Sequence, residues 1–309
     1  MGEPKAHHLL PRFYLKGFRD PEDRRTNGGA ARDRVWVHDR EHGCIEARNI
    51  KRLTVRRHYY SADTRGGGRD ATPEKALANF EDRVAPILRD LRPDWQPSGR
   101  QKAALAHFAA LMKFRVLGYR PWALGYAEDN AVQIRERVFP SPEALREDLR
   151  RHGHPEAQDP ETVERVFRDL HSGAYELTFT KNHLLERMFS ISVRAAEALL
   201  HKRWVLGWAP PGTSFVTLDD PFVLMDPALG APIGYMGDVG FAVARAVGLL
   251  PLTQTTCLIA MGEAVGEGEG VHHLAYSKKD VRDINIAQAT HYERWLIARH
   301  GPLLERLVG

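Results

Sequence analysis

The pattern of hydrophobic and polar positions indicates strands near both ends of the chain and helices between them. Residues 34–38 (RVWVH) alternate with period two, residues 39–43 supply turn-forming Asp and Gly, and an extended pattern returns at residues 44–47. Alternation that meets at a turn predicts a β-hairpin. We expect further strands in three short apolar runs bounded by Pro, Gly and Asp, at residues 204–208, 214–218 and 256–261.

Helical periodicity dominates the middle of the chain. Capping residues and Pro in the first turn predict four helix starts, at Thr72-Pro73, Ser98 with Gln101, Ser141-Pro142 and Asp159-Pro160. Two long helices are expected at residues 183–201 and 280–300, and Gly301-Pro302 would end the second one.

The order of these elements predicts an α+β fold rather than alternating βαβ units. We expect an N-terminal β-hairpin, a central helical bundle, and a small C-terminal β-sheet with a final long helix. The chain has 309 residues and no internal repeat, which fits one large domain. We therefore expect a single domain over residues 1–309, with sub-regions at 1–70, 71–203 and 204–309.

Composition narrows the class of protein. The chain is 43% hydrophobic and 27% charged, which is typical of a globular protein with a sizeable core. No run approaches the roughly 18 apolar residues of a membrane span, and the N-terminus lacks the apolar stretch of a secretory signal. The two cysteines, Cys44 and Cys257, cannot form a disulfide scaffold. We therefore expect a cytoplasmic protein without membrane contact.

Positive charge is concentrated in the N-terminal sub-region. Residues 1–70 carry 16 Lys and Arg against 10 Asp and Glu, whereas the rest carries 28 against 30. Basic residues followed by aromatic ones can bind a phosphate backbone and stack on bases. This favours RNA or DNA as a partner, bound through Arg52, Arg56 and Arg57. The alternative is a solvated strand edge, where charge prevents edge-to-edge pairing.

Two glutamates share one face of the first predicted helix. Glu74 and Glu81 are seven residues apart, so two helical turns place both on a stripe that is otherwise apolar. A buried carboxylate needs a partner or a metal ion. The functional interpretation is a site for a divalent cation, Mg²⁺ or Mn²⁺. The structural interpretation is a pair of salt bridges at the edge of the core.

Arg115 supplies a partner for either interpretation. It lies on the inward stripe of the next helix, so Glu81 and Arg115 could form a buried ion pair between antiparallel helices. In the functional interpretation Arg115 holds a phosphate or carboxylate bidentately, and Arg120 adds a second guanidinium.

Two further candidates are His8 and Asp219. His8 could act as a general base or a metal ligand, although a histidine beside aromatic residues is more often structural. Asp219 follows a predicted strand, where a carboxylate can face a cleft and bind a cation. The alternative for Asp219 is a turn, because Asp before Asp-Pro is strong turn chemistry.

Several segments together resemble the bacterial domain-of-unknown-function family 4238. They cover nearly the whole chain in order: residues 7–18 (HHLLPRFYLKGF), 35–39 (VWVHD), the helix of Glu74 and Glu81, 108–115 (FAALMKFR), 215–221 (FVTLDDP), 251–253 (PLT) and the region of Asn285. The resemblance implies a shared fold and a shared site, but no activity, because none is known for the family.

The chain departs from the family pattern at two places. The family has Ser-Asp-Asn-Pro where this chain has Leu218-Asp219-Asp220-Pro221, so the serine is missing and one acid is added. The family also has Arg followed closely by Pro, so either Arg115 or Arg120 could be the equivalent residue.

The leading hypothesis is a metal-dependent phosphodiesterase or nuclease. Glu74, Glu81 and Asp219 would hold the cation, His8 would act as base or ligand, and Arg115 would stabilise the phosphoryl charge. Two alternatives use the same residues. One is a nucleic-acid- or protein-binding module with structural Glu–Arg pairs, and the other is an enzyme for a small anionic metabolite.

Overall fold

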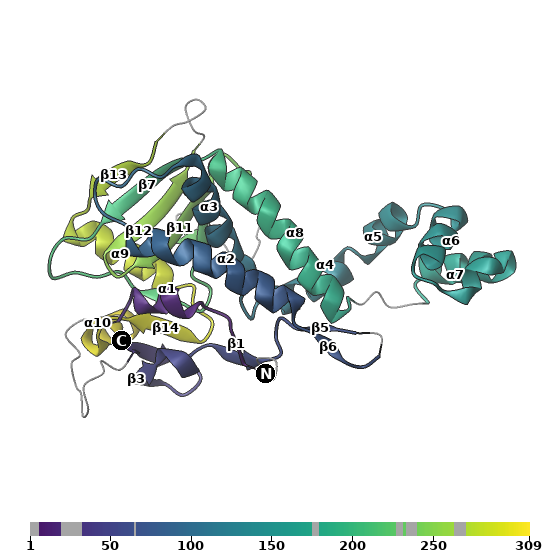
Figure 1. Ribbon diagram of the computed structural model, residues 1–309, viewed down its shortest axis with the longest axis horizontal. Helices are drawn as coiled ribbons and strands as arrows, with labels where there is room; N and C mark the ends of the chain where they lie inside the picture. The colour runs from purple at the N-terminus through teal and green to yellow at the C-terminus, as the bar shows by residue number, and fades with distance from the viewer. Residues whose placement is uncertain are drawn as a thin grey trace. The chain divides into compact units, whose positions relative to one another are not determined.

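The computed structural model describes residues 6–19, 33–64, 66–174, 179–226, 231–232, 240–262 and 270–309. Its element order confirms the α+β class, with strands at the N-terminal end, helices in the middle and a sheet with a final helix at the C-terminal end (Figure 1). The α-helices are α1 (Arg12–Lys16), α2 (Thr72–Arg89), α3 (Gly99–Phe114), α4 (Tyr119–Asp129), α5 (Ala131–Val138), α6 (Pro142–Arg151), α7 (Pro160–Ser172), α8 (Lys181–Leu200), α9 (Lys278–Ala289) and α10 (Gly301–Val308). Two short 3-10 helices are η1 (Ile50–Arg52) and η2 (Pro155–Gln158).

The strands form four sheets. Strands of the N-terminal third are β1 (Ala6–His8), β2 (Arg34–Asp39), β3 (Cys44–Asn49), β4 (Val55–Arg57), β5 (Ala62–Asp63) and β6 (Arg69–Asp70). Those of the C-terminal third are β7 (Arg203–Trp208), β8 (Thr217–Leu218), β9 (Val223–Asp226), β10 (Ala231–Pro232), β11 (Val247–Thr253), β12 (Thr256–Met261), β13 (His272–Ala275) and β14 (Trp295–Ala298).

The sequence predicts a single domain over residues 1–309. Within this span, the contacts between residues divide the chain into two compact units. The first comprises Met1–Tyr119 and Leu185–Gly309, and the second is Arg120–Leu184. In the second unit, α5, α6 and α7 pack around a small apolar core of Leu145, Ala157, Val163 and Leu170. Ser141 and Asp159 cap α6 and α7, as their Ser-Pro and Asp-Pro pairs predict.

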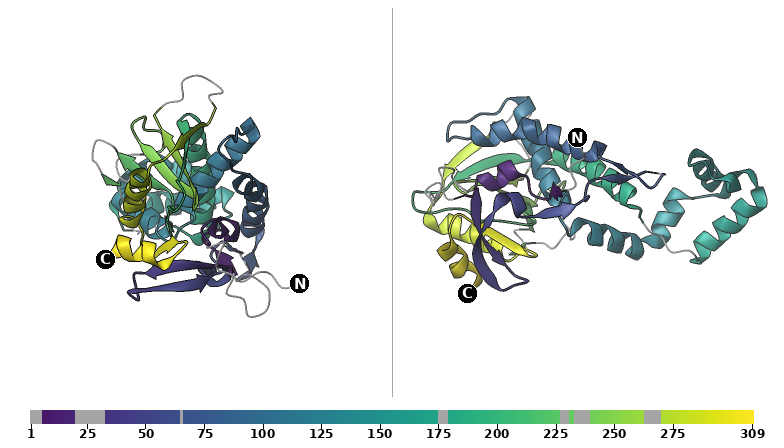
Figure 2. Two further views of the ribbon diagram at one scale, coloured as in Figure 1. Left: turned by 90° about the vertical axis from the view of Figure 1, so that its left-hand side faces the viewer. Right: turned by 60° about the horizontal axis from the view of Figure 1, so that its bottom comes forward.

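A six-stranded sheet carries much of the apolar core of the first unit. Its order is β10-β9-β11-β12-β7-β13, and all pairs are antiparallel except β13 with β7. Phe215, Cys257 and Val281 belong to one buried cluster on this sheet, so α9 covers one face. Figure 2 shows α2 and α3 on the opposite side. The middle strands are therefore buried on both faces, which explains their continuous apolar runs.

A four-stranded sheet joins the two ends of the chain. Its order is β3-β2-β14-β8, so the predicted N-terminal hairpin of β2 and β3 pairs with a C-terminal strand. Leu218, Leu296 and Leu304 are fully buried together, because α10 packs on this sheet. Strand β14 therefore connects the N-terminal hairpin with the C-terminal part of the chain within one sheet.

The C-terminal region differs from the expected long helix over residues 280–300. The helix ends at Ala289, a loop follows, and Trp295–Ala298 form β14, so that expectation was wrong. The four residues of β14 are all buried and pair with β2 and β8. Tertiary pairing therefore overrides a local pattern that is compatible with a helix. Of the strand expected at residues 214–218, only Thr217–Leu218 pair.

The buried helix α3 runs through the centre of the first unit. Its start shows the predicted capping box of Ser98 and Gln101, and nearly every residue of its second half is buried. A polar residue in this half, Lys113, is 1% exposed. In the part of the chain that the structure describes, no helix has the length and apolar character needed to cross a bilayer.

Asp39 ties the four-stranded sheet together. Its fully buried carboxylate Oδ2 lies 2.8 Å from a guanidinium nitrogen of Arg48 and 3.2 Å from one of Arg294, and accepts the indole N–H of Trp295 at 3.3 Å. Burial alone would raise the pKa of Asp39, but hydrogen bonds from Arg294, Arg48, His42 and Trp295 hold it well below its usual range. The carboxylate therefore links β2, β3 and β14 in its ionised form.

We expect Asp39→Asn to lower the free energy of unfolding by about 1–3 kcal/mol, because the two guanidinium groups lose their shared anion. The depressed pKa means that this stabilisation is present above the unfolded pKa and is lost as the pH falls below it. Thermal denaturation at pH 7 and pH 3 checks both points. A wild type and variant that differ equally at both pH values would contradict the role of the ionised form.

Candidate functional site

The buried His7 pairs with the partly exposed Glu74, and this contact fixes the N-terminal strand against α2. The Nε2 of His7 lies 2.8 Å from a carboxylate oxygen of Glu74, and its Nδ1 accepts the backbone N–H of Tyr60 at 2.9 Å. Because Nδ1 is an acceptor, the ring proton lies on Nε2 and is donated to Glu74. Glu74 was predicted to point inward, and the group that its carboxylate contacts there is the imidazole of His7.

Glu81 and Arg115 form the ion pair that the structural interpretation predicts. A guanidinium nitrogen of Arg115 donates to Glu81 at 2.7 Å, and a second one donates to the backbone carbonyl of His8 at 2.9 Å. The Arg115 side chain is 3% exposed, and its backbone carbonyl accepts the hydroxyl of Tyr60 at 2.7 Å. Arg115 thus joins α3 to α2 and to the N-terminal strand β1.

His8 itself lies at the edge of this group. Its Nε2 lies 3.2 Å from the backbone carbonyl of Lys51, which accepts a hydrogen bond when Nε2 carries the proton. Burial lowers the pKa of His8, and the positive charges of Arg12 and Arg115 act in the same direction, while Lys51 and Glu81 oppose them. The imidazole is therefore neutral at pH 7 and can accept a proton.

Both carboxylate oxygens of Asp219 accept hydrogen bonds from the backbone of a loop that is distant in sequence. Its Oδ1 accepts the N–H of Glu293 at 3.0 Å, and its Oδ2 accepts those of Arg294 at 2.7 Å and Trp295 at 3.1 Å. Three amide donors on one buried carboxylate fix the segment between α9 and β14. The geometry therefore gives Asp219 a positioning role for the residues of this loop.

A second buried cluster of ionisable groups lies beside that loop. Lys113 donates to Oδ2 of Asp220 at 2.6 Å, and both side chains are at most 3% exposed. The Nε2 of His291 lies 3.3 Å from the same oxygen and 3.4 Å from the Lys113 nitrogen. The other oxygen of Asp220, Oδ1, is buried and has no hydrogen-bond partner among the described residues. We call Lys113, Asp220, His291 and Glu293 the central cluster.

Glu293 is the exposed member of the central cluster. Partial burial of its carboxylate, followed by the negative charges of Asp219 and Asp220, raises its pKa, while Lys113 and His291 oppose the rise. Its carboxylate packs against Gly118, where any side chain would collide with it. Glu293 therefore holds a proton at a higher pH than an ordinary glutamate, which suits a general acid.

The basic candidates are spread over several elements. Arg52 ends η1, Arg56 and Arg57 lie on β4, and the guanidinium of Arg56 lies 5.7 Å from the ring centroid of Trp295. Arg56 is thus brought close to the loop of Glu293. Arg120 lies on α4, at the start of the second unit.

The three predicted metal ligands are held by other groups. Glu74 pairs with His7, Glu81 with Arg115, and Asp219 with backbone amides, and they form no shared group of ligand atoms in the described structure. Among the described residues such a group is formed by Asp39, Glu41 and His42. The Asp39 carboxylate is already bound by Arg48 and Arg294, and Glu41 and His42 lie in the exposed turn between β2 and β3.

Sequence reasoning missed most of the central cluster. His291 and Glu293 fell inside the helix expected over residues 280–300, and neither was singled out as a candidate. Lys113 offered a detectable signal, because it is the one charged residue in the apolar run of residues 108–114. Asp220 was noticed only as part of the turn that follows Asp219.

We expect Asp219→Asn to lower stability by about 1–3 kcal/mol, because an amide N–H would face backbone N–H groups. Asp283→Asn, a change at an exposed carboxylate of α9, is the matched control. Chemical denaturation measures both variants, and equal stabilities would contradict the anchoring role of Asp219.

Comparison with known proteins places this geometry in a family. No curated protein and no solved structure gave a significant match to the chain. One family model, described as "Protein of unknown function (DUF4238)", matches residues 6–301, a span that contains every residue of both buried groups described above. The chain therefore belongs to the DUF4238 family, in agreement with the resemblance seen in its sequence.

Proposed function

We propose that the protein is a metal-dependent phosphodiesterase that acts on nucleic acid, with the central cluster as its active site. The observation that carries this proposal is the buried oxygen Oδ1 of Asp220, which has no partner although Lys113 and His291 hold the other oxygen. An unsatisfied buried carboxylate oxygen costs about 1–3 kcal/mol, and such a cost is commonly retained for a ligand.

Two members of the cluster suit proton transfer in opposite directions. Donation from Nε2 of His291 to Asp220 leaves Nδ1 as the base that takes a proton from water. The water oxygen then forms a bond to phosphorus, and the bond from phosphorus to the leaving oxygen breaks. Glu293, with its raised pKa, gives its proton to that leaving oxygen. Lys113 fixes the position of the Asp220 carboxylate, which in turn orients His291.

The divalent cation, Mg²⁺ or Mn²⁺, is placed at Asp220 in this proposal. Oδ1 of Asp220 would offer the hard oxygen ligand that both ions prefer, and phosphate and water oxygens would complete the coordination, while Glu293 keeps its proton as the general acid. Glu74, Glu81 and Asp219 are left out as ligands, because each already binds a partner within the protein. The cation would bind the phosphate and lower its negative charge.

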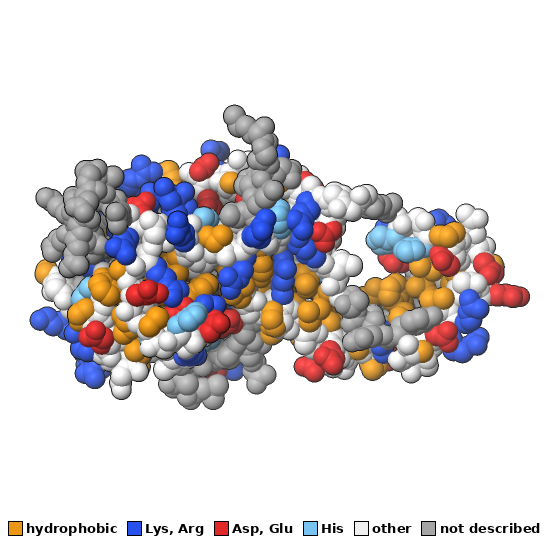
Figure 3. Space-filling model, turned by 90° about the horizontal axis from the view of Figure 1, so that it is seen from below, with side chains coloured by type: hydrophobic (Ala, Val, Ile, Leu, Met, Phe, Trp, Pro, Cys, Tyr) orange, Lys and Arg blue, Asp and Glu red, His pale blue; other side chains and the backbone are white. Residues whose placement is uncertain are grey.

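The substrate is proposed to approach along the basic N-terminal strands. Arg56 lies over Trp295, two residues after Glu293, and Arg52 and Arg57 are exposed nearby in sequence. The face seen in Figure 3 mixes basic side chains with acidic ones, so it offers separate positive charges rather than a continuous basic surface. Such a pattern suits a few phosphate contacts close to one scissile bond.

A binding module without catalysis is the second candidate. It is favoured because the carboxylates of Glu74, Glu81 and Asp219 already bind partners within the protein. In this interpretation the three residues have a structural role only. It predicts salt-dependent binding of nucleic acid with no turnover.

We expect Glu293→Gln to reduce phosphodiesterase activity about 100-fold or more, since general acid catalysis contributes that much. The substrates are single-stranded DNA and RNA, assayed with Mn²⁺. Glu305→Gln, at an exposed position of α10, is the control and should retain full activity. Circular dichroism confirms that both variants fold. Turnover that Glu293→Gln leaves unchanged would exclude the central cluster as the active site.

The pH dependence of kcat provides an independent test. Because the pKa of Glu293 is raised, the catalytic proton is present at low pH and is lost as the pH rises through that pKa, so kcat should fall on the alkaline side. Glu293→Gln should remove this limb of the profile. EDTA should abolish activity and Mn²⁺ should restore it; activity that survives EDTA would refute the part assigned to the cation.

A further inference from the structure

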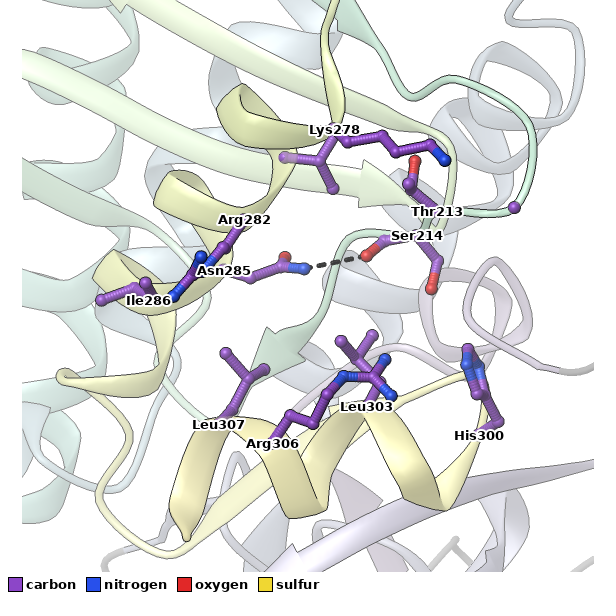
Figure 4. A pocket seen from close by; sticks show the side chains of 12 residues that line it. Thr213, Ser214, Lys278, Arg282, Asn285, Ile286, His300, Leu303, Arg306 and Leu307 are labelled. Atoms are coloured by element: carbon purple, nitrogen blue, oxygen red, sulfur yellow. Dashed lines mark hydrogen bonds between the residues drawn. The ribbon is translucent and has the colours of Figure 1, made fainter.

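A separate pocket lies between α9, α10 and the loop of residues 212–214. Its volume is about 510 Å³, which is the size of a small-molecule site. The residues around it come from these three segments, as Figure 4 shows. None of them belongs to the central cluster, so the pocket is a different site from the proposed active site.

The charged side chains that line this pocket are all basic. Lys278 and Arg282 lie one turn apart on α9, Arg306 lies on α10, and no Asp or Glu lines the pocket. Within the described residues, the side chains of these three residues form no ion pair and no hydrogen bond. The nearby Asp283 is paired with Lys279 at 2.6 Å. Three cations around one hollow are suited to a ligand with two or more negative charges.

A buried hydroxyl at the pocket wall supplies an independent observation. Ser214 is 4% exposed, and its Oγ is buried with no hydrogen-bond partner among the described residues. Its backbone is fixed, because the side-chain amide of Asn285 donates to the Ser214 carbonyl at 2.9 Å and accepts from Val216 at 2.9 Å. Figure 4 shows Ser214 between Thr213 and His300 at the edge of the hollow. A hydroxyl held in this way without a protein partner is available to a polar ligand.

Part of the wall is aliphatic. Val281 and Ile286 come from α9, and Leu303 and Leu307 come from α10. A free inorganic ion would leave this apolar surface exposed to water. A ligand with a charged end and a larger uncharged body would cover it and would also reach the cations.

We propose that this pocket binds a small phosphorylated ligand of mononucleotide size. Arg282, Arg306 and Lys278 hold its phosphates, Ser214 donates its hydroxyl to a phosphate oxygen, and the aliphatic wall contacts its uncharged part. The proposal stands on the pocket alone and does not depend on the activity of the central cluster.

The test is isothermal titration calorimetry of the full chain with three probes: adenosine 5′-diphosphate, inorganic pyrophosphate and adenosine. We expect the diphosphate to bind most tightly, pyrophosphate to bind more weakly, and adenosine to show no binding. Arg282→Gln and Arg306→Gln should each raise the Kd for the diphosphate about tenfold, and Ser214→Ala should raise it as well.

Two controls separate this site from the rest of the molecule. Lys279→Gln changes the adjacent exposed residue of α9 and should leave the Kd unchanged. Glu293→Gln should also leave it unchanged, which distinguishes the pocket from the central cluster. Absence of binding by both phosphorylated probes, or diphosphate binding that Arg282→Gln and Arg306→Gln do not weaken, would overturn the proposal.

Discussion

The carboxylate of Asp219 is the contact on which the rest of the first unit depends. It accepts three consecutive backbone N–H groups, those of Glu293, Arg294 and Trp295. These amides belong to the last two residues of the loop and to the first residue of β14, the strand that lies between the N-terminal hairpin and β8. Without a buried acceptor at this point, three donors would have no partner at the start of a fully buried strand. One side chain thus makes the pairing of the two chain ends possible.

The same anchor positions groups that can do chemistry. Asp219 and Asp220 are consecutive residues of the bend that directly follows β8, and their carboxylates have different partners. One carboxylate meets the loop backbone while the next meets Lys113. Two basic residues at the end of α3 also have different partners, because Lys113 contacts Asp220 and Arg115 contacts Glu81. The end of α3 is consequently shared by the central cluster and by the ion pairs of the N-terminal strand.

Local patterns in the sequence were sufficient to predict much of the fold. The hairpin followed from period-two alternation, the start of α3 from Ser98 and Gln101, and the Glu81–Arg115 pair from helical spacing. Each of these depends on residues that are close in sequence or on neighbouring helices. The strand β14 could not be predicted in this way, because its four residues are strand only when β2 and β8 are beside it. Misplacing that strand also concealed His291 and Glu293.

The candidate site was harder to predict because charge on an inward face does not distinguish a functional group from a structural one. Glu74, Glu81, Asp219 and Asp220 all lie inward. One oxygen of Glu74 contacts His7, one oxygen of Glu81 accepts from Arg115, and both oxygens of Asp219 accept backbone amides. Only the contacts of each oxygen separate them from Asp220, whose Oδ1 has no partner within the described chain. Those contacts join residues that are 34 to 107 positions apart, as in Glu81–Arg115 and Lys113–Asp220. Whether the oxygens of a carboxylate already have hydrogen-bond partners therefore depends on the tertiary structure. This difference places the proposed active site at the loop before β14 rather than on α2.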